Sequence, residues 1–286
     1  FIIGNKVLQH DIKRTDKSTS FDWIGFALIS LASASLLIAL DIVSSKKVLN
    51  MLSIVLLLIF ISSSIGTVKH LIKATSPLFS IRALRFPSYK VSQFGGSIMW
   101  LTVGAIPYLS TIFFQNACHW SAIKTGAIVL FIFVGNIAIK PFANNIIQKL
   151  GFKNTIIVSL FLIFFTTFMV GMLTGQINQF YIIAILTLSG VGRSLALTAY
   201  NGMSLVEIPY DERNSANILA AVSQNLSQGI GISLVTICIS VLNQYQSVLN
   251  AYRLTYILLG IIIIVPLIEV LTQSGHLGVV EESKLN

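Results

Sequence analysis

Long runs of apolar residues follow one another along almost the whole chain. A helix of about 20 apolar residues crosses a hydrocarbon core of about 30 Å. The pattern predicts eight transmembrane spans, at residues 22–42, 49–68, 91–114, 122–142, 154–174, 179–206, 215–242 and 252–271. All eight are expected to be helices, because the runs lack the alternation over about ten residues that marks membrane barrel strands. The predicted fold class is therefore all-α, a polytopic membrane helical bundle.

The composition supports a membrane protein. Of the 286 residues, 55% are hydrophobic and only 10% are charged, whereas a soluble domain is about 25% charged. The net charge of +9 could suit nucleic acid. The basic residues, however, lie in short loops beside apolar runs, so membrane topology explains them better and no nucleic-acid partner is expected.

Lys and Arg residues fall mostly in alternate gaps between the spans. Of the 19, fourteen lie on one side of the eight-span scheme, four lie on the other, and Arg193 is inside a span. By the positive-inside rule, both termini of this chain are expected in the cytoplasm. The start, Phe1-Ile2-Ile3-Gly4, looks like the tail of an earlier apolar helix. We therefore expect the C-terminal part of a longer protein.

The motifs of soluble catalysis are absent from the sequence. It contains no GxxxxGK(S/T) loop, no GxGxxG between a strand and a helix, and no HExxH. Cys118 and Cys238 have no metal-ligand spacing with His and do not form a disulfide framework. We therefore expect no enzyme, no metal site and no cofactor.

Arg193 is the most informative polar residue, since it lies near the middle of the sixth span. Placing Arg there costs about 2.5–3.5 kcal/mol on insertion scales, so it should face the bundle interior or a water-filled cavity. Asn201 lies about two turns further on, on the same side of the helix. The sequence leaves two readings of Arg193 open: a substrate or gating contact, or a structural residue bonded to carbonyl groups.

Two other spans carry polar faces. In the seventh span the residues that share one face are Asn217, Gln224, Gln228 and Gly231. The third span has a weaker face, beside the kink expected at Pro107, formed by Gln93, Ser97, Gly104, Tyr108 and Gln115. Such faces serve either hydrogen bonding between helices or the lining of a transport path.

Carboxylates are scarce inside the spans. Asp41 lies near the outer end of the first span, and Glu269 lies near the inner end of the last. Neither forms a convincing relay for protons at membrane depth. A carboxylate that couples transport to protons is therefore expected outside this chain.

Several stretches resemble the fourteen-span drug:proton antiporter branch of the major facilitator superfamily. They are FDWIG at 21–25, PLFSIRALR at 77–85, IFFQ at 112–115, SAIKTGAIVL at 121–130, GVGRSLALTAYNGMSL at 190–205 and SANILAAVSQNLSQGIGIS at 215–233. The resemblance covers the chain nearly end to end. It implies a cytoplasmic linker at 1–21, two accessory helices with a cytoplasmic loop at 22–89, a six-helix transporter bundle at 90–273 and a cytoplasmic tail at 274–286.

The stretch at 141–154 resembles the cytoplasmic loop motif of the superfamily. It keeps the residues Lys149, Gly151 and Lys153, but has Asn144 where Gly is usual and Gln148 where Asp is usual. The role of that loop as a charge relay is therefore not expected here. A turn with positive φ at Gly151 is expected, because glycine adopts that backbone readily.

The resemblance implies export of small organic compounds across the bacterial inner membrane in exchange for protons, as in multidrug-type efflux. In this superfamily two six-helix bundles rock around a central site. The implied partners are the small-molecule substrate, protons, the lipid bilayer and an N-terminal six-helix half that this chain lacks. The residues expected to face the path are Arg193, Asn201, Gln224, Gln228, Tyr108 and Gln115. The alternatives are an importer or metabolite exporter of the same fold, and a truncated remnant that does not transport.

The predicted orientation can be tested with reporter fusions. An enzyme that is active only outside the cytoplasm should stay inactive when it is fused within 143–153 or within 206–214, because both connections are predicted to be cytoplasmic. Fusions within 243–247 should be active and serve as the control. Opposite results for the first two connections would contradict the eight-span scheme.

Overall fold

The computed structural model describes residues 21–46, 50–74, 77–79, 81–173 and 178–273. The predicted linker, apart from Phe21, and the predicted tail at 274–286 lie outside the described residues. The helices are α2 (Trp23–Lys46), α3 (Met51–Lys73), the 3-10 helix η2 (Ile81–Arg85), α4 (Pro87–Asn116), α5 (Ala122–Gly171), α6 (Gln179–Val206), α7 (Arg213–Leu242) and α8 (Val248–Thr272). All regular elements in this described part are helical, which confirms the all-α prediction.

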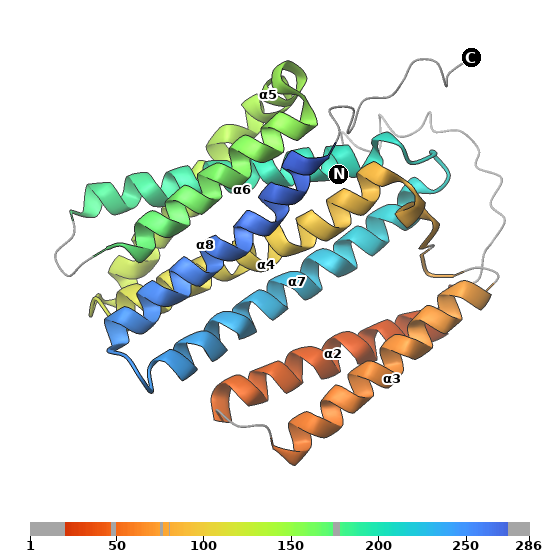
Figure 1. The fold of residues 1–286 in the computed structure, drawn as a ribbon, viewed down its shortest axis with the longest axis horizontal. Helices are drawn as coiled ribbons and strands as arrows, with labels where there is room; N and C mark the ends of the chain where they lie inside the picture. Colours follow the sequence, from red (N-terminus) through yellow and green to blue (C-terminus); the bar gives the residue numbers. More distant parts are fainter. Residues whose placement is uncertain (1–20, 47–49, 75–76, 80, 174–177, 274–286) are drawn as a thin grey trace, which may run out of the picture.

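Seven helices in the described part of the chain are long and apolar enough to cross a membrane. The helix α5 has 50 residues, and a straight helix of that length would measure about 75 Å, more than twice the hydrocarbon thickness. Gly151 interrupts it with φ 77° and ψ 165°, and Figure 1 shows the two arms of α5 folded back on each other. These arms correspond to the predicted spans 122–142 and 154–174, so the seven helices accommodate eight spans.

Polar side chains at the helix starts satisfy backbone N–H groups that have no partner within the helix. Asn50 caps α3 in a capping box with Ser53. Ser121 accepts a hydrogen bond from the backbone of Lys124 at the start of α5, and Asn178 accepts one from the backbone of Phe180 at the start of α6. Such caps are typical of helix N-termini. They show why the apolar runs begin as helices where they do.

The helices pack in a bundle with an attached pair. In Figure 1, α2 and α3 lie together at the side of α7, while α7 and α8 flank α4. The helix α6 packs against α4 and against both arms of α5. The main core cluster consists of apolar side chains from α4, both arms of α5, α6, α7 and α8. The bundle that carries Arg193 is therefore formed by the last six spans.

Glycines allow the closest helix contacts. A Cβ added to Gly135 in the first arm of α5 would collide with the carbonyl oxygen of Thr187 in α6, and one added to Gly190 would collide with the carbonyl oxygen of Ile132. In the second arm the contact is less close, since a Cβ added to Gly192 would lie 3.2 Å from both the carbonyl oxygen of Ser159 and Cγ1 of Ile163. Small residues of this kind let helices in membranes approach closely.

Polar contacts join the helices at both ends of the bundle. At one end Glu207, which follows α6, accepts a hydrogen bond from the backbone N–H of Ser88 in the first turn of α4, 3.1 Å away. At the other end the hydroxyl of Tyr256 donates to Ser110, and the side chain of Asn116 donates to the hydroxyl of Tyr252, both at 2.9 Å. These bonds fix α4 against α6 and α8.

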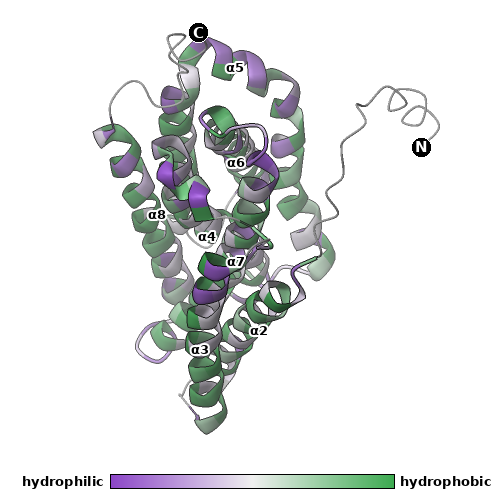
Figure 2. Cartoon of the chain, turned by 90° about the vertical axis from the view of Figure 1, so that its right-hand side faces the viewer, coloured by the Kyte–Doolittle hydropathy of each residue, from purple (hydrophilic) through white to green (hydrophobic). Residues whose placement is uncertain are grey.

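The helices α2 and α3 depend on lipid for most of their surface. Leu52, Leu58 and Ile61 are among the large apolar side chains that α3 leaves exposed. Figure 2 shows that most residues along the helices are hydrophobic, while hydrophilic residues gather at the end that holds the turn of α5. Apolar surface of this extent marks a membrane protein.

Asp22 joins the start of α2 to the end of α3. Its carboxylate lies 2.7 Å from Nε2 of His70 and accepts hydrogen bonds from the backbone N–H groups of Gly25 and Leu78, at 2.8 and 3.0 Å. Burial by itself would raise the pKa of Asp22. The hydrogen bonds from Gly25, His70 and Leu78 outweigh burial and hold that pKa below its usual value.

The contact of α5 with α6 predicts that Gly135→Ala destabilises the bundle. The new methyl group would press on the carbonyl of Thr187, and overpacking of this kind costs about 1–3 kcal/mol. Thermal unfolding in detergent should show a lower Tm. Gly126→Ala is the matched control, because nothing lies within 4 Å of its added Cβ. Equal Tm values for the two variants would contradict the packing described above.

The junction at Asp22 predicts that Asp22→Asn weakens the pairing of α2 with α3. Hydrogen bonds to a charged group contribute about 1.5–3 kcal/mol, and the exposed Asp211 supplies the control variant Asp211→Asn. Because folding lowers the pKa of Asp22, its stabilisation is present at neutral pH and is lost as the pH falls through that lowered pKa. The unfolding curves of parent and variant should differ at neutral pH and converge in acid. A constant difference at all pH values would contradict this assignment.

Candidate functional site

The helix α6 leaves one face open. Its other faces are covered by α4 and by the two arms of α5, with the carbonyl of Tyr200 accepting a hydrogen bond from Ser92 of α4 at 2.8 Å. The residues Arg193, Leu197 and Asn201 are spaced four apart, so they share one side of the helix. Arg193 and Leu197 are half-buried and Asn201 is exposed. We call these three residues the α6 open face.

Arg193 lies on this face with most of its guanidinium buried. Among the described residues, no hydrogen-bond partner reaches its Nε or its Nη1. No carboxylate of the described chain forms an ion pair with it. A buried charge without a partner is costly. The carbonyl partners that a purely structural role requires are missing at these two nitrogen atoms.

Asn201 lines a cavity of about 740 Å³ between the first arm of α5 and α6. Its lining residues are Lys140, Asn144, Ile147, Gln148, Phe152, Leu197, Thr198, Asn201, Gly202 and Leu205. The cavity therefore brings Asn201 together with Asn144 and Gln148, the two positions where the loop sequence departs from the motif of the superfamily. Its polar lining suits hydrogen bonding to a small molecule or to water.

The three retained residues of the loop motif occupy different surroundings. Gly151 has φ 77°, which confirms the expected positive-φ turn. Lys149 is exposed. The ammonium group of Lys153 donates a hydrogen bond to the carbonyl oxygen of Gln273, directly after α8. The loop thus anchors the end of α8 through Lys153 and reverses the chain at Gly151.

Two of the polar residues predicted to face the path lie where α4 meets α7. A Cβ added to Gly104 of α4 would lie 2.6 Å from Cγ of Gln228, so the two helices are close at this point. The hydroxyl of Tyr108 accepts a hydrogen bond from Thr236 at 3.4 Å. Gln228 thus packs closely against α4, and Tyr108 forms a hydrogen bond between α4 and α7.

The other predicted path residues remain separate from Arg193. Gln224 and Gln115 are half-buried on α7 and α4. Within the described part of the chain, no hydrogen bond links either of them to Arg193 or Asn201. The structure thus divides the six predicted residues into the α6 open face and a second group on α4 and α7.

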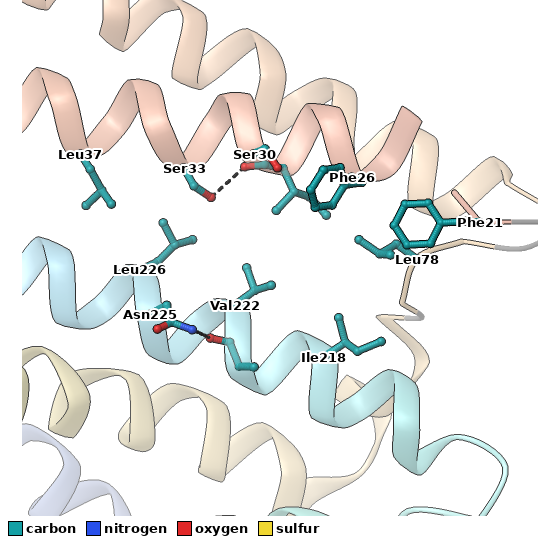
Figure 3. A pocket seen from close by; sticks show the side chains of 12 residues that line it. Phe21, Phe26, Ser30, Ser33, Leu37, Leu78, Ile218, Val222, Asn225 and Leu226 are labelled. Carbon is teal, nitrogen blue, oxygen red and sulfur yellow. Dashed lines mark hydrogen bonds between the residues drawn. The ribbon is translucent and has the colours of Figure 1, made fainter. Parts of the chain in front are cut away.

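A groove of about 560 Å³ separates α2 from α7. Figure 3 shows apolar side chains from both helices facing this groove, among them Phe26, Leu37, Val222 and Leu226. Two of its polar residues bond back to their own helices, Ser33 to the carbonyl of Ile29 and Asn225 to that of Ala221. The groove is therefore mostly apolar.

A buried carboxyl group adds to the site. Oε2 of Glu269 in α8 is buried without a hydrogen-bond partner among the described residues, and so is the hydroxyl of Tyr200 in α6. The sequence analysis noted Glu269 and gave it no role. The sequence feature that could have identified Glu269 is a carboxylate about one turn before the end of a highly apolar helix, three residues after Pro266.

The described residues include no group of three or more His, Cys, Asp or Glu side chains that could hold a metal ion. The arrangement instead combines membrane-length helices with polar groups that are buried and unpartnered. These features fit a polytopic membrane protein.

Comparisons with known proteins identify the family. Residues 93–272 match the family model of the Major Facilitator Superfamily. The chain therefore belongs to the Major Facilitator Superfamily, and the suspected resemblance is confirmed at the level of the superfamily.

The chain is also similar to curated bacterial proteins that carry the name "Putative multidrug resistance protein MdtD". The identity is 21% to the protein of Enterobacter sp. (strain 638), over 86% of this chain and 54% of that protein. It is 24% to the protein of Serratia proteamaculans, over 86% of this chain and 53% of that protein. The chain thus spans about half the length of the curated relatives it matches.

Proposed function

We propose that this chain is part of a transporter that exports small organic compounds across the bacterial inner membrane in exchange for protons. Membership of the Major Facilitator Superfamily and the names of the similar proteins support export of the multidrug type. The observation that carries the proposal is that Nε and Nη1 of Arg193, on the α6 open face, are buried without a hydrogen-bond partner among the described residues.

The proposal assigns a place to each part of the chain. Residues 90–273 form one six-helix bundle, and 22–89 supply an accessory pair with its loop. A second six-helix bundle faces the α6 open face, and the substrate passes between the two bundles. Both termini of this chain lie in the cytoplasm. The exposure of Asn201 beside the half-buried Arg193 supports this arrangement, because a polar face on a membrane helix must meet protein or water.

Arg193 and Asn201 have different roles in this proposal. In surroundings of low dielectric constant a guanidinium attracts negative charge strongly. Arg193 therefore binds an anionic group of the substrate, or pairs with an acidic side chain of the facing bundle when that group is absent. Asn201 offers both a donor and an acceptor at the mouth of the α5–α6 cavity, and it holds the polar part of the substrate there.

The test is efflux by the intact protein with Arg193→Ala. Losing a hydrogen bond to a charged group costs about 1.5–3 kcal/mol, so transport of a limiting substrate should fall at least about tenfold. Arg193→Lys, which keeps the charge, should retain part of the activity. The control is Arg85→Ala, since Arg85 is an exposed residue of η2. Membrane vesicles with an imposed pH gradient and a panel of anionic and cationic dyes supply the measurement.

Three results of this assay would count against the proposal. Equal transport by the parent and Arg193→Ala would leave Arg193 a structural residue. Dye movement in the opposite direction would favour an importer of the same fold. Transport that does not respond to the pH gradient would remove the exchange with protons.

A further inference from the structure

Three helices of the bundle meet at a small polar cluster around Gly95. A Cβ added to Gly95 of α4 would lie 2.5 Å from Oε2 of Glu269 in α8 and 2.9 Å from the hydroxyl oxygen of Tyr200 in α6. Both oxygen atoms therefore face the same glycine from opposite helices. Only a residue without a side chain leaves this space free. We call Gly95, Tyr200 and Glu269 the Gly95 cluster.

The two oxygen atoms of the cluster are buried and unsatisfied. Tyr200 is 1% exposed, and within the described chain neither its hydroxyl nor Oε2 of Glu269 has a hydrogen-bond partner. Glu269 as a whole keeps partial exposure. One oxygen of the carboxyl group is thus enclosed beside Tyr200, while the group stays within reach of the surface near the end of α8.

The Lys and Arg residues of the neighbouring helices that lie in the described part of the chain do not pair with Glu269. Lys153, from the second arm of α5, donates to the carbonyl oxygen of Gln273, about one turn beyond Glu269. Lys90 of α4 is exposed, and Arg213 of α7 donates to the carbonyl oxygen of Ile208. No described cation forms an ion pair with Glu269. Since no positive charge of the described residues holds the carboxylate ionised, it can take up and release a proton.

From this geometry we propose that Glu269 is the proton-binding residue that couples transport to the pH gradient, an inference that rests on the proposed function. A proton from water bonds to the carboxylate and gives the neutral carboxyl group, and the reverse step returns the proton to water. The ionised carboxylate can only accept hydrogen bonds, whereas the neutral carboxyl group can also donate one, here beside the unpartnered hydroxyl of Tyr200. The two states therefore hold α6 and α8 together differently.

The cluster is connected to the α6 open face through α6 itself. Tyr200 is adjacent to Asn201 and lies about two turns from Arg193 on the same helix. Ser92 of α4 is bonded to the backbone carbonyl of Tyr200. A shift of α6 at the Gly95 cluster therefore moves the residues proposed to bind the substrate. The proposal places the coupling carboxylate within this chain, whereas the sequence analysis expected it outside.

The experiment compares the intact parent protein with Glu269→Gln in proteoliposomes. The probe is fluorescein or ethidium, whichever the parent transports. Uptake driven by a pH gradient should fall at least about tenfold in the variant. Counterflow of the same dye without a gradient should stay within about twofold, because it needs no net proton movement. Asp41→Asn is the matched control, since Asp41 is an exposed carboxylate of α2, and it should behave as the parent does.

The other outcomes separate the two proposals. Parent uptake that ignores the pH gradient would overturn the exchange with protons itself, and the role of Glu269 with it. A parent that responds to the gradient beside an equally active Glu269→Gln would overturn the role of Glu269 alone. Loss of counterflow together with driven uptake would also overturn it, because Glu269 would then be structural.

A second measurement uses proton release in detergent solution. Adding the dye to the parent in weak buffer should release protons, and Glu269→Gln should bind the dye but release fewer. Tyr200→Phe keeps the buried ring and removes the hydroxyl, so it should shift the pH at which release is half-maximal. Equal release by the parent and Glu269→Gln at equal dye binding would overturn the proposal.

Discussion

The structure depends on the properties of lipid as a solvent. Helices in lipid must satisfy their backbone hydrogen bonds internally. They must also pack against one another without the hydrophobic effect as a driving force. Close contact supplies the attraction that remains. At Gly135, Gly190 and Gly231 the facing atom is a backbone carbonyl oxygen of the neighbouring helix. These contacts place α6 against the first arm of α5 and α7 against α4. The positions of all the polar residues follow from this packing.

The helix α6 packs against α4 and α5 on its other sides, so only the α6 open face can contact a substrate or a second bundle. A guanidinium there has few ways to find a partner within its own bundle, and two nitrogen atoms of Arg193 have none among the described residues. The same packing encloses Tyr200 and one oxygen of Glu269 beside Gly95. Buried groups without partners persist where a function requires them. The bundle therefore contains a cation on α6 and, in a separate place, a carboxyl group on α8 near Tyr200 of α6.

The polar face of α7 shows that polar residues at helical spacing can also serve packing between helices. Helical spacing places Gln228 and Gly231 on one face, and the structure uses that face to pack on α4, with Gly231 against the carbonyl of Leu101. Spacing specifies which residues share a face, but it does not specify what covers that face. The polar residues of α6 and α7 looked alike in the sequence, and only the neighbouring helices distinguish them.

The sequence by itself determined the helices, their membrane length, the reversal at Gly151 and the family, because hydrophobic run length, glycine conformation and local motifs are properties of neighbouring residues. It also singled out Arg193, since a charge within an apolar run is conspicuous without any partner. The tertiary structure decided which groups meet. Gly95, Tyr200 and Glu269 are separated by many residues and come together only when α4, α6 and α8 pack, because contacts between distant segments depend on the arrangement of helices and leave no periodic signal in the chain.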